Sequence, residues 1–276
     1  MPYLYELGTL DGVYTMLKFN AATGSTTFVC QDPLCSHSWS DDCPFAMADY
    51  CCSDGDMVYY RRFLEYDTGN MWGLCTYDIT EQKARLVCET DVCDTGFAVF
   101  YQGMYYSECI SEEGDVYYLT ADMHTGEIRE SEIMPELPQI ERPTDRFQWT
   151  EQTLTDRKSG AAVLSGVNYA AFFEEIVVCY VTEPEPAFIG HCDTTGKDIY
   201  DTCGGKLYIV SADDMNVKTV ECGRCIAADV QQVGKYLVVS YGAFRDNNGT
   251  ELWNPYGGGR IVYDTASGEV NIYEDN

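Results

Sequence analysis

The sequence of 276 residues predicts an all-β protein built from one repeated unit of strands. Three observations support this fold class. A short segment ending in Asp or Asn, then a Thr-Gly or Ser-Gly turn, then an alternating run of residues recurs along the chain. A second turn, followed by a Tyr-rich or Val-rich run, stands upstream of several copies. The copies also recur at regular intervals. Turn residues between runs of period two are typical of antiparallel hairpins.

The repeated hairpin can be located residue by residue. Five copies stand at Phe19–Gly24, Tyr77–Thr80, Ala121–Gly126, Ser211–Asn216 and Tyr263–Gly268. The Asx side chain caps the turn and glycine accepts a positive φ, so both residue types favour a tight reversal. With anchors at positions 20, 78, 122, 212 and 264, one interval is about twice the others. A degenerate copy is therefore expected between Pro135 and about Val177.

The upstream turns complete each unit as a meander of about four strands. They lie at Asp54–Tyr60, Gln102–Tyr106 and Val233–Val239. Radial repetition of such units predicts a β-propeller of six four-stranded blades in a single domain over residues 1–276. A β-sandwich is the alternative, because strands alternating with turns occur in both.

Individual blades differ in completeness. The first unit lacks a candidate for its innermost strand, whereas the last has strands near Ile226–Gln232, Lys235–Tyr241, Arg260–Tyr263 and Glu269–Tyr273. The Pro-containing region 134–160 is either an eroded blade or an excursion over one face, and 182–202 is a second excursion.

Composition limits the partners. The net charge of −28 and the lack of a basic stripe argue against nucleic acid and anionic lipid as partners. No apolar run is long enough to span a membrane, and the first residues do not resemble a signal peptide. We expect a monomer that binds a protein or glycan. It is cytoplasmic, or extracytoplasmic if a leader has been removed.

The segment Cys30–Cys43 carries the strongest chemical signal. Cys30, Cys35, His37 and Cys43 are spaced as C-x4-C-x-H-x5-C within a junction loop at 30–45. Three sulfurs and one nitrogen suit tetrahedral zinc, and four protein ligands would make the site structural. Disulfides or unpaired thiols are the alternatives. Asp41 and Asp42 could accept the imidazole N–H or could be solvated charges.

Other cysteines follow the repeat. Positions ten residues beyond the anchors include Cys30, Cys88 and Cys222, and each is followed by a second thiol, at Cys35, Cys93 and Cys225. Cys88 and Cys93 are expected either to form a junction disulfide or to remain as reduced thiols. A second zinc site could combine Cys222 and Cys225 with His191, Cys192 or Cys203, and the adjacent Cys51 or Cys52 could replace a ligand of the first. Cys75, Cys109 and Cys179 lie in β-type runs and are expected in the core.

The motif also resembles a known group of proteins. Cys30, Asp32, Pro33, Cys35, His37, Cys43 and the following Pro44-Phe45 are similar to a motif in uncharacterised Tyr-rich, TolB-like propeller proteins and lipoproteins of anaerobic gut Firmicutes. This resemblance implies a propeller fold, export from the cytoplasm and a metal site. It implies no activity.

No catalytic constellation of comparable quality is present. The sequence has no G-x-S-x-G elbow, phosphate loop or H-E-x-x-H helix, and only three histidines. We therefore expect a non-catalytic binding or scaffolding propeller with a structural zinc. The alternative is a hydrolase of glycans or peptides with its site over the central channel, where His191 or Arg245 could join convergent acids.

Overall fold

The computed structural model describes residues 2–37, 43–67, 69–91, 94–111, 113–135, 146–173, 175–182, 188–191, 198–200, 205–221, 226–246 and 253–274. The chain divides into an N-terminal unit, Tyr3–Gln139, and a C-terminal unit, Ile140–Asn276 with the first two residues. Each unit is described by itself, and the expectation of one domain over 1–276 stays a prediction.

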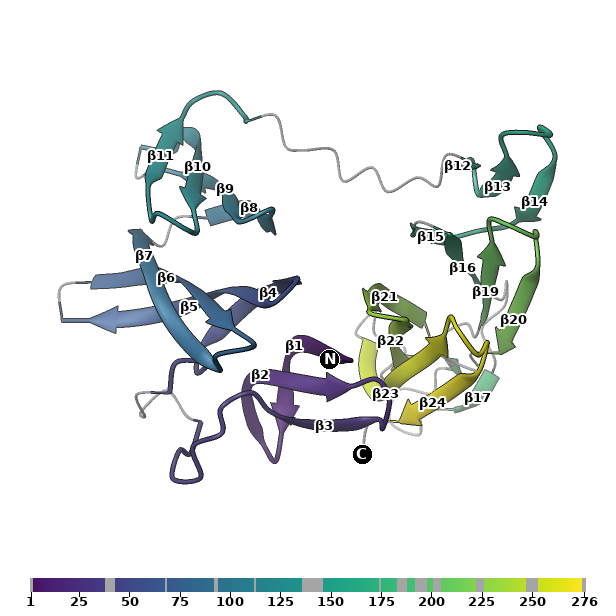
Figure 1. The fold of residues 1–276 in the computed structure, drawn as a ribbon, viewed down its shortest axis with the longest axis horizontal. Coiled ribbons are helices and arrows are strands. Elements are labelled where there is room, and N and C mark those ends of the chain that lie inside the picture. The colour runs from purple at the N-terminus through teal and green to yellow at the C-terminus, as the bar shows by residue number, and fades with distance from the viewer. Residues whose placement is uncertain are drawn as a thin grey trace. The chain divides into compact units, whose positions relative to one another are not determined.

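The N-terminal unit holds three antiparallel sheets, numbered here in chain order (Figure 1). In each sheet, strands that follow one another in sequence are hydrogen-bonded neighbours. The first sheet comprises β1 (Tyr3–Leu10), β2 (Val13–Asn20) and β3 (Ser25–Phe28). The second comprises β4 (Ala48–Asp54), β5 (Met57–Tyr66), β6 (Gly69–Asp78) and β7 (Lys83–Asp91). The third comprises β8 (Asp94–Tyr101), β9 (Met104–Ile110), β10 (Val116–Asp122) and β11 (Ile128–Ser131).

The C-terminal unit repeats this plan. The fourth sheet comprises β12 (Phe147–Thr150), β13 (Thr153–Asp156) and β14 (Ala162–Ser165). The fifth comprises β15 (Tyr169–Phe172), β16 (Ile176–Thr182), β19 (Gly205–Ser211) and β20 (Val217–Glu221). The small hairpin of β17 (Phe188–His191) and β18 (Asp198–Tyr200) is inserted between β16 and β19. The sixth comprises β21 (Ile226–Val233), β22 (Tyr236–Asp246), β23 (Trp253–Asp264) and β24 (Val270–Glu274).

The predicted all-β fold of six blade-like sheets is confirmed. The described part of the first sheet has three strands, as expected from its missing innermost strand. The fourth sheet is the degenerate copy, which matches the eroded-blade interpretation of the region before residue 160 from Phe147 onward. The four strands expected in the last unit are all present. None of the described elements is a helix, so none could cross a membrane as one.

Alternating burial explains how the sheets stack within each unit. Tyr60 belongs to the core between the first and second sheets, whereas its neighbour Tyr59 belongs to the core between the second and third. Val178 and Val177 divide in the same way between the two cores of the C-terminal unit. Successive side chains of a strand point to opposite faces, so a middle sheet buries both.

One backbone hydrogen bond repeats and corrects the register expected from sequence. In the second to sixth sheets, the residue after the anchor donates its N–H to the carbonyl just before the strand that precedes the anchor strand in the sheet, as Met123 does to Gly103 (2.9 Å) and Arg157 to Arg146 (2.7 Å). Asp156 is thus the anchor of the fourth sheet. In the fifth sheet Ala212 donates this bond, to Glu175. The anchor there is Ser211, so the assignment of Ala212, and with it the ten-residue register of Cys222, was wrong by one position.

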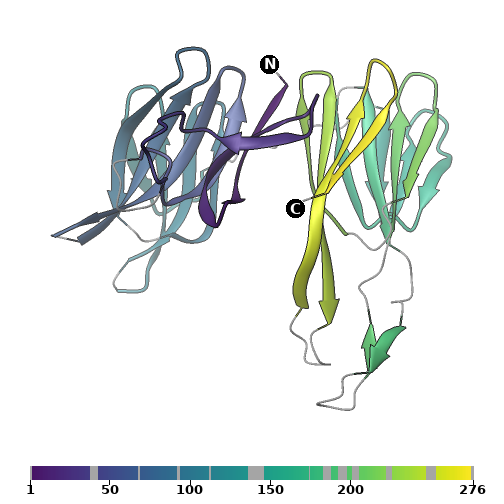
Figure 2. The ribbon, with the colours of Figure 1, turned by 90° about the horizontal axis from the view of Figure 1, so that it is seen from below.

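The two ends of the sheets differ. We call the end with the anchor turns the turn end and the opposite end the loop end. At the loop end of the N-terminal unit lie the junction loop between β3 and β4, the β5–β6 connection and the β9–β10 loop. In the C-terminal unit, the long β22–β23 hairpin and the β17–β18 hairpin project beyond one end of the sheets (Figure 2). Connections at the loop end therefore range from the two-residue β5–β6 turn to the junction loop and the inserted β17–β18 hairpin, and such variation is typical of binding faces.

Candidate metal centre

The junction loop begins with a tight turn that returns the chain toward Cys30. The backbone N–H of Cys35 donates to the Asp32 carbonyl at 3.2 Å, and the N–H of Leu34 donates to Asp32 Oδ1 at 2.9 Å. Pro33 fixes its own φ inside this turn, and the Asp32 side chain caps it. The turn therefore brings Cys30 and Cys35 onto one side of the loop.

His37 reaches the same point because its backbone is in the left-handed region, with φ at 58°. Its N–H donates to Cys35 Sγ at 3.3 Å, and its ring lies against Phe28 with the ring centroids 4.2 Å apart. Its Nδ1 lies 4.0 Å from Cys43 Sγ. A single residue separates Cys35 from His37, and the positive φ is what lets both side chains face one centre.

Cys43 starts a strap, residues 43–47, whose carbonyl oxygens are held by two different sheets. Tyr60 from β5 donates its hydroxyl to the Pro44 carbonyl at 3.1 Å, and Thr15 from β2 donates to the Phe45 carbonyl at 3.0 Å. Two further bonds run from Arg62 Nη1 to the Cys43 carbonyl (3.2 Å) and from the Phe63 N–H to the Met47 carbonyl (3.0 Å). The strap thus fixes Cys43 between the first and second sheets.

The four expected ligands meet in space. One donor atom each from Cys30, Cys35, His37 and Cys43 lies within 4.8 Å of the other three. In a tetrahedral zinc site, metal–ligand lengths of about 2.0–2.3 Å place the donor atoms about 3.5–3.8 Å apart. The group needs only a small contraction to reach that geometry. It could therefore hold a metal ion.

Backbone N–H groups aim at the sulfurs. Cys30 accepts a hydrogen bond from the backbone of Asp32, Cys35 from His37, and Cys43 from Phe45. In each case the donor is two residues after the cysteine. A hydrogen bond of this kind favours the thiolate, which is the form that binds metal.

Burial acts in the opposite direction on two of these thiols. It raises the pKa of Cys43 to about 12, with the neighbouring thiols of Cys35 and Cys30 adding to the effect. Burial also raises the pKa of Cys30. A cation placed among the sulfurs would reverse this balance, because it stabilises the thiolates directly. Without a cation, the thiols of Cys43 and Cys30 would be neutral at pH 7.

The remaining cysteines with described side chains lie outside the donor group. Cys51, considered from sequence as a substitute ligand, donates its thiol to the Tyr5 carbonyl (3.7 Å) instead. Cys75, Cys109 and Cys179 are buried, as expected for core residues. Cys88 is half-buried in β7. None of the nine cysteines described this way forms a disulfide.

Several expected residues lie outside the described part of the chain. They are Asp41, Asp42, Cys93, Cys192, Cys203, Cys222 and Cys225. His191 ends strand β17 and Arg245 lies in β22, but their side chains are not among those described. The second zinc site, the Cys88–Cys93 pairing and the roles considered for His191 and Arg245 therefore stay predictions.

Sequence reasoning missed the residues that support the centre. Thr15, Tyr60 and Arg62 come from strands β2 and β5 and act through single hydrogen bonds. No spacing rule relates them to the cysteines. The Tyr-Tyr-Arg-Arg run at 59–62, with two cations inside a buried strand, was the one available signal.

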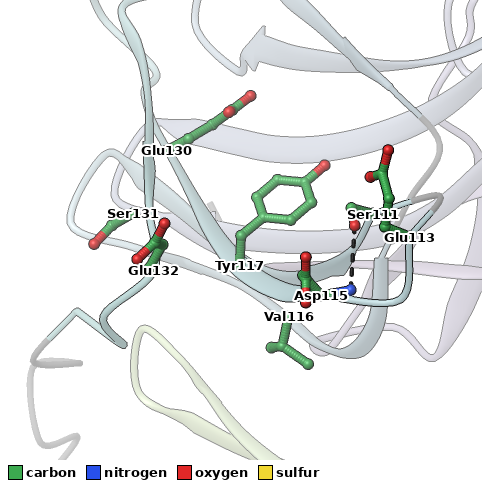
Figure 3. A pocket seen from close by; sticks show the side chains of 8 residues that line it. All are labelled: Ser111, Glu113, Asp115, Val116, Tyr117, Glu130, Ser131 and Glu132. Atoms are coloured by element: carbon green, nitrogen blue, oxygen red, sulfur yellow. Dashed lines mark hydrogen bonds between the residues drawn. The ribbon is translucent and has the colours of Figure 1, made fainter.

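A second candidate is an open pocket of about 750 Å³ on the third sheet. Figure 3 shows Tyr117 at its centre, with Glu130 and Glu132 on one side and Glu113 and Asp115 on the other. The backbone N–H of Asp115 donates to Ser111 Oγ at 3.1 Å, which orders the β9–β10 loop beside it. These carboxylates are solvated surface groups, so the pocket on its own defines no ligand site.

Comparisons with known proteins add a fold likeness. No family model matches, and no curated protein matches. Among solved structures, the chain is similar to the propeller domain of the trilobed protease from Pyrococcus furiosus, at 11% identity and a TM-score of 0.29 over 83% of this chain and 80% of that one.

Two further solved structures cover nearly the whole chain. An oligogalacturonate lyase in complex with manganese is 12% identical, with a TM-score of 0.35 over 98% of this chain and 73% of that one. TolB from Acinetobacter baumannii is 10% identical, with a TM-score of 0.32 over 95% of this chain and 60% of that one. At these values the likeness carries no argument about function. The fold assignment rests on the sheets themselves, and neither a family nor a source organism is assigned.

Proposed function

We propose that this chain is a non-catalytic binding or scaffolding β-propeller whose first blade junction is fixed by a structural zinc ion. The observation that carries the proposal is the meeting of three thiols and one imidazole nitrogen within 4.8 Å. Four protein donors complete a tetrahedral shell and leave no position for water or substrate. Such a centre stabilises a fold and performs no chemistry.

Zinc suits this donor set better than the hard cations. Thiolate sulfur and imidazole nitrogen are preferred by zinc, whereas calcium and magnesium require oxygen ligands. The backbone hydrogen bonds to the sulfurs support bound thiolates, which disulfide-bonded cysteines would not need.

The position of the centre supports a structural role. Cys30 follows the last strand of the first sheet, and Cys43 precedes the first strand of the second. A metal held by both would fasten the two sheets where the chain passes between them. The loop end would then carry the binding surface for a protein or glycan, because the junction loop and the inserted β17–β18 hairpin lie there.

The decisive experiment is elemental analysis of protein purified without added metal, with two matched variants. Cys35→Ser removes a half-buried ligand, and Cys88→Ser removes a half-buried thiol outside the donor group. We expect one zinc per chain in the wild type and in Cys88→Ser, and about none in Cys35→Ser. Equal metal content in all three proteins, or no metal in the wild type, would refute the proposal.

A further inference from the structure

Arg62 stands at the edge of the metal centre with its charge directed toward the loop. It is half-buried in β5, where it pairs with Ala48 of β4, and its Nη1 donates to the carbonyl of the ligand Cys43 at 3.2 Å. Its positive charge also lowers the pKa of the neighbouring Cys75 against the effect of burial. The guanidinium therefore lies beside the Cys43 carbonyl and close to the Cys75 thiol.

This cation has no carboxylate partner among the described residues. No ion pair involves Arg62 there, and its Nε is buried without a hydrogen-bond partner in the same part of the chain. Glu89 lies across Gly73 on β7, but its Oε1 accepts the hydroxyl of Tyr66 at 2.9 Å. The adjacent Arg61 shows the usual solution, a pair with Asp49 in which Nε and Oδ1 lie 2.9 Å apart. A buried charge without a partner is costly unless another charge balances it.

We propose that Arg62 is the counter-charge of the metal centre, and this inference rests on the proposed zinc site. Zinc bound by three thiolates and a neutral imidazole has a net charge of about minus one. That charge would be partly buried, since Cys43 is only 2% exposed. The guanidinium offsets it from the side of the Cys43 carbonyl, and the metal centre in turn supplies the anion that Arg62 lacks.

The test compares zinc affinity in variants that separate charge from hydrogen bonding. Arg62→Gln keeps a donor for the Cys43 carbonyl but removes the charge, whereas Arg62→Lys keeps both. Arg85→Gln, on the exposed part of β7, controls for general loss of positive charge. Dissociation constants come from competition with a chromophoric chelator on each purified full-length protein.

We expect Arg62→Gln to bind zinc about tenfold more weakly, within the range found when groups behind metal ligands are removed. Arg62→Lys and Arg85→Gln should stay within about threefold of the wild type. Thermal unfolding of the metal-free proteins supplies the second readout. A counter-charge predicts a lower midpoint for Arg62→Gln with zinc bound and an equal or higher midpoint without it, because the unpaired charge is then costly.

Two results would overturn the inference. One is a wild type that binds one zinc and an Arg62→Gln variant with the same affinity. The other is an Arg62→Lys variant as weak as Arg62→Gln, which would assign the role to the shape of the guanidinium. If Arg62→Gln does not fold, the affinity of Arg62→Lys still decides between charge and shape. A wild type that binds no zinc would refute the proposed function itself, which is a distinct outcome.

Discussion

The two ends of the N-terminal unit's sheets hold their turns with different atoms in the same arrangement. At the turn end, Asp122 Oδ1 accepts the backbone N–H of His124, two residues later, at 2.8 Å. At the loop end, Cys35 Sγ accepts the N–H of His37, also two residues later, at 3.3 Å. A carboxylate is ionised at neutral pH by itself, whereas a thiol is not. We therefore expect the Asp122 turn to be stable without a bound ion and the Cys35 turn to need a cation.

The pKa values show the same contrast. Hydrogen bonds from the backbone N–H groups of His124 and Thr125 hold the pKa of Asp122 below its ordinary value. Burial raises the pKa of Cys43 to about 12, although the Phe45 N–H acts to lower it. Backbone N–H groups lower the pKa of the solvated Asp122. For the buried Cys43 they are outweighed by desolvation, which opposes the charged form.

The largest expected effect comes from removing the proposed zinc ion. Chelation should destabilise the N-terminal unit by about 4 kcal/mol relative to protein in free zinc at a thousand times the dissociation constant. Hydrogen exchange followed by mass spectrometry should show faster exchange in β2–β5, with β21–β24 unchanged as the internal control. Equal loss of protection in both units would contradict a local role for the metal.

The next largest effect is expected at Arg61, whose contacts require no metal ion. Arg61 donates to Asp49 and, at 3.0 Å, to the Tyr105 hydroxyl of the third sheet, and it lies 4.2 Å from the centroid of the Trp72 ring. Arg61→Gln should cost about 2 kcal/mol, less than for a fully buried pair because Asp49 is partly exposed.

Denaturant unfolding of Arg61→Gln measures this cost. The control is Arg129→Gln, which breaks an exposed ion pair with Glu127 and should change stability by less than about 0.5 kcal/mol. Similar costs for the two variants would show that burial of Arg61 contributes nothing.

A smaller effect is expected at a single anchor turn. Asp264 accepts the N–H groups of Ala266 (2.9 Å) and Ser267 (3.2 Å) and pairs with Lys235. Asp264→Ala should lower the thermal midpoint by less than Arg61→Gln does, because the partner Lys235 has 52% of its side chain exposed. Asp264→Asn, which keeps an acceptor oxygen, should recover part of the loss. No difference between Ala and Asn would mean that the cap is not used.

The smallest effect is the pH dependence of these caps. The pKa values of Asp122, Asp156, Asp214 and Asp264 are all lowered, chiefly by hydrogen bonds. Their stabilisation is complete above the unfolded-state pKa of about 3.9 and is lost as the pH falls through the lower folded-state values. Thermal midpoints should therefore fall below about pH 4, and in Asp264→Asn the fall should be smaller. An equal fall in wild type and variant would exclude this carboxylate as a contributor.

Most of the fold could be predicted because the anchor turns have a sequence signature. Asp156-Arg-Lys-Ser159-Gly160 follows the pattern of Asp264-Thr-Ala-Ser267-Gly268, but the prolines that precede it leave an eroded blade and an excursion both open from sequence. The anchor of the fifth sheet is Ser211, one residue before the predicted position. Two acids follow it, Asp213 and Asp214, and only Asp214 caps the turn, by accepting the N–H of Asn216. Local hydrogen-bond patterns, unlike composition, settle such registers.

The meeting of the four donor residues was also predictable, since they lie in one loop. The hydrogen bonds that hold Cys43 in place were not predictable, because they come from side chains that only the stacking of the sheets brings close. The positive φ of His37 could not be predicted from residue type either, since histidine adopts it only occasionally.

The strap at residues 43–47 sets the order in which a metal would be lost. Its carbonyls are tied to β2 and β5 independently of any ion, so Cys43 keeps its place when the site is empty. Cys30, Cys35 and His37 are held chiefly by bonds within their own short segment. Exchange with a competing chelator should therefore open from the Cys30–His37 side, with Cys43 the last sulfur to leave and the first to capture a new ion.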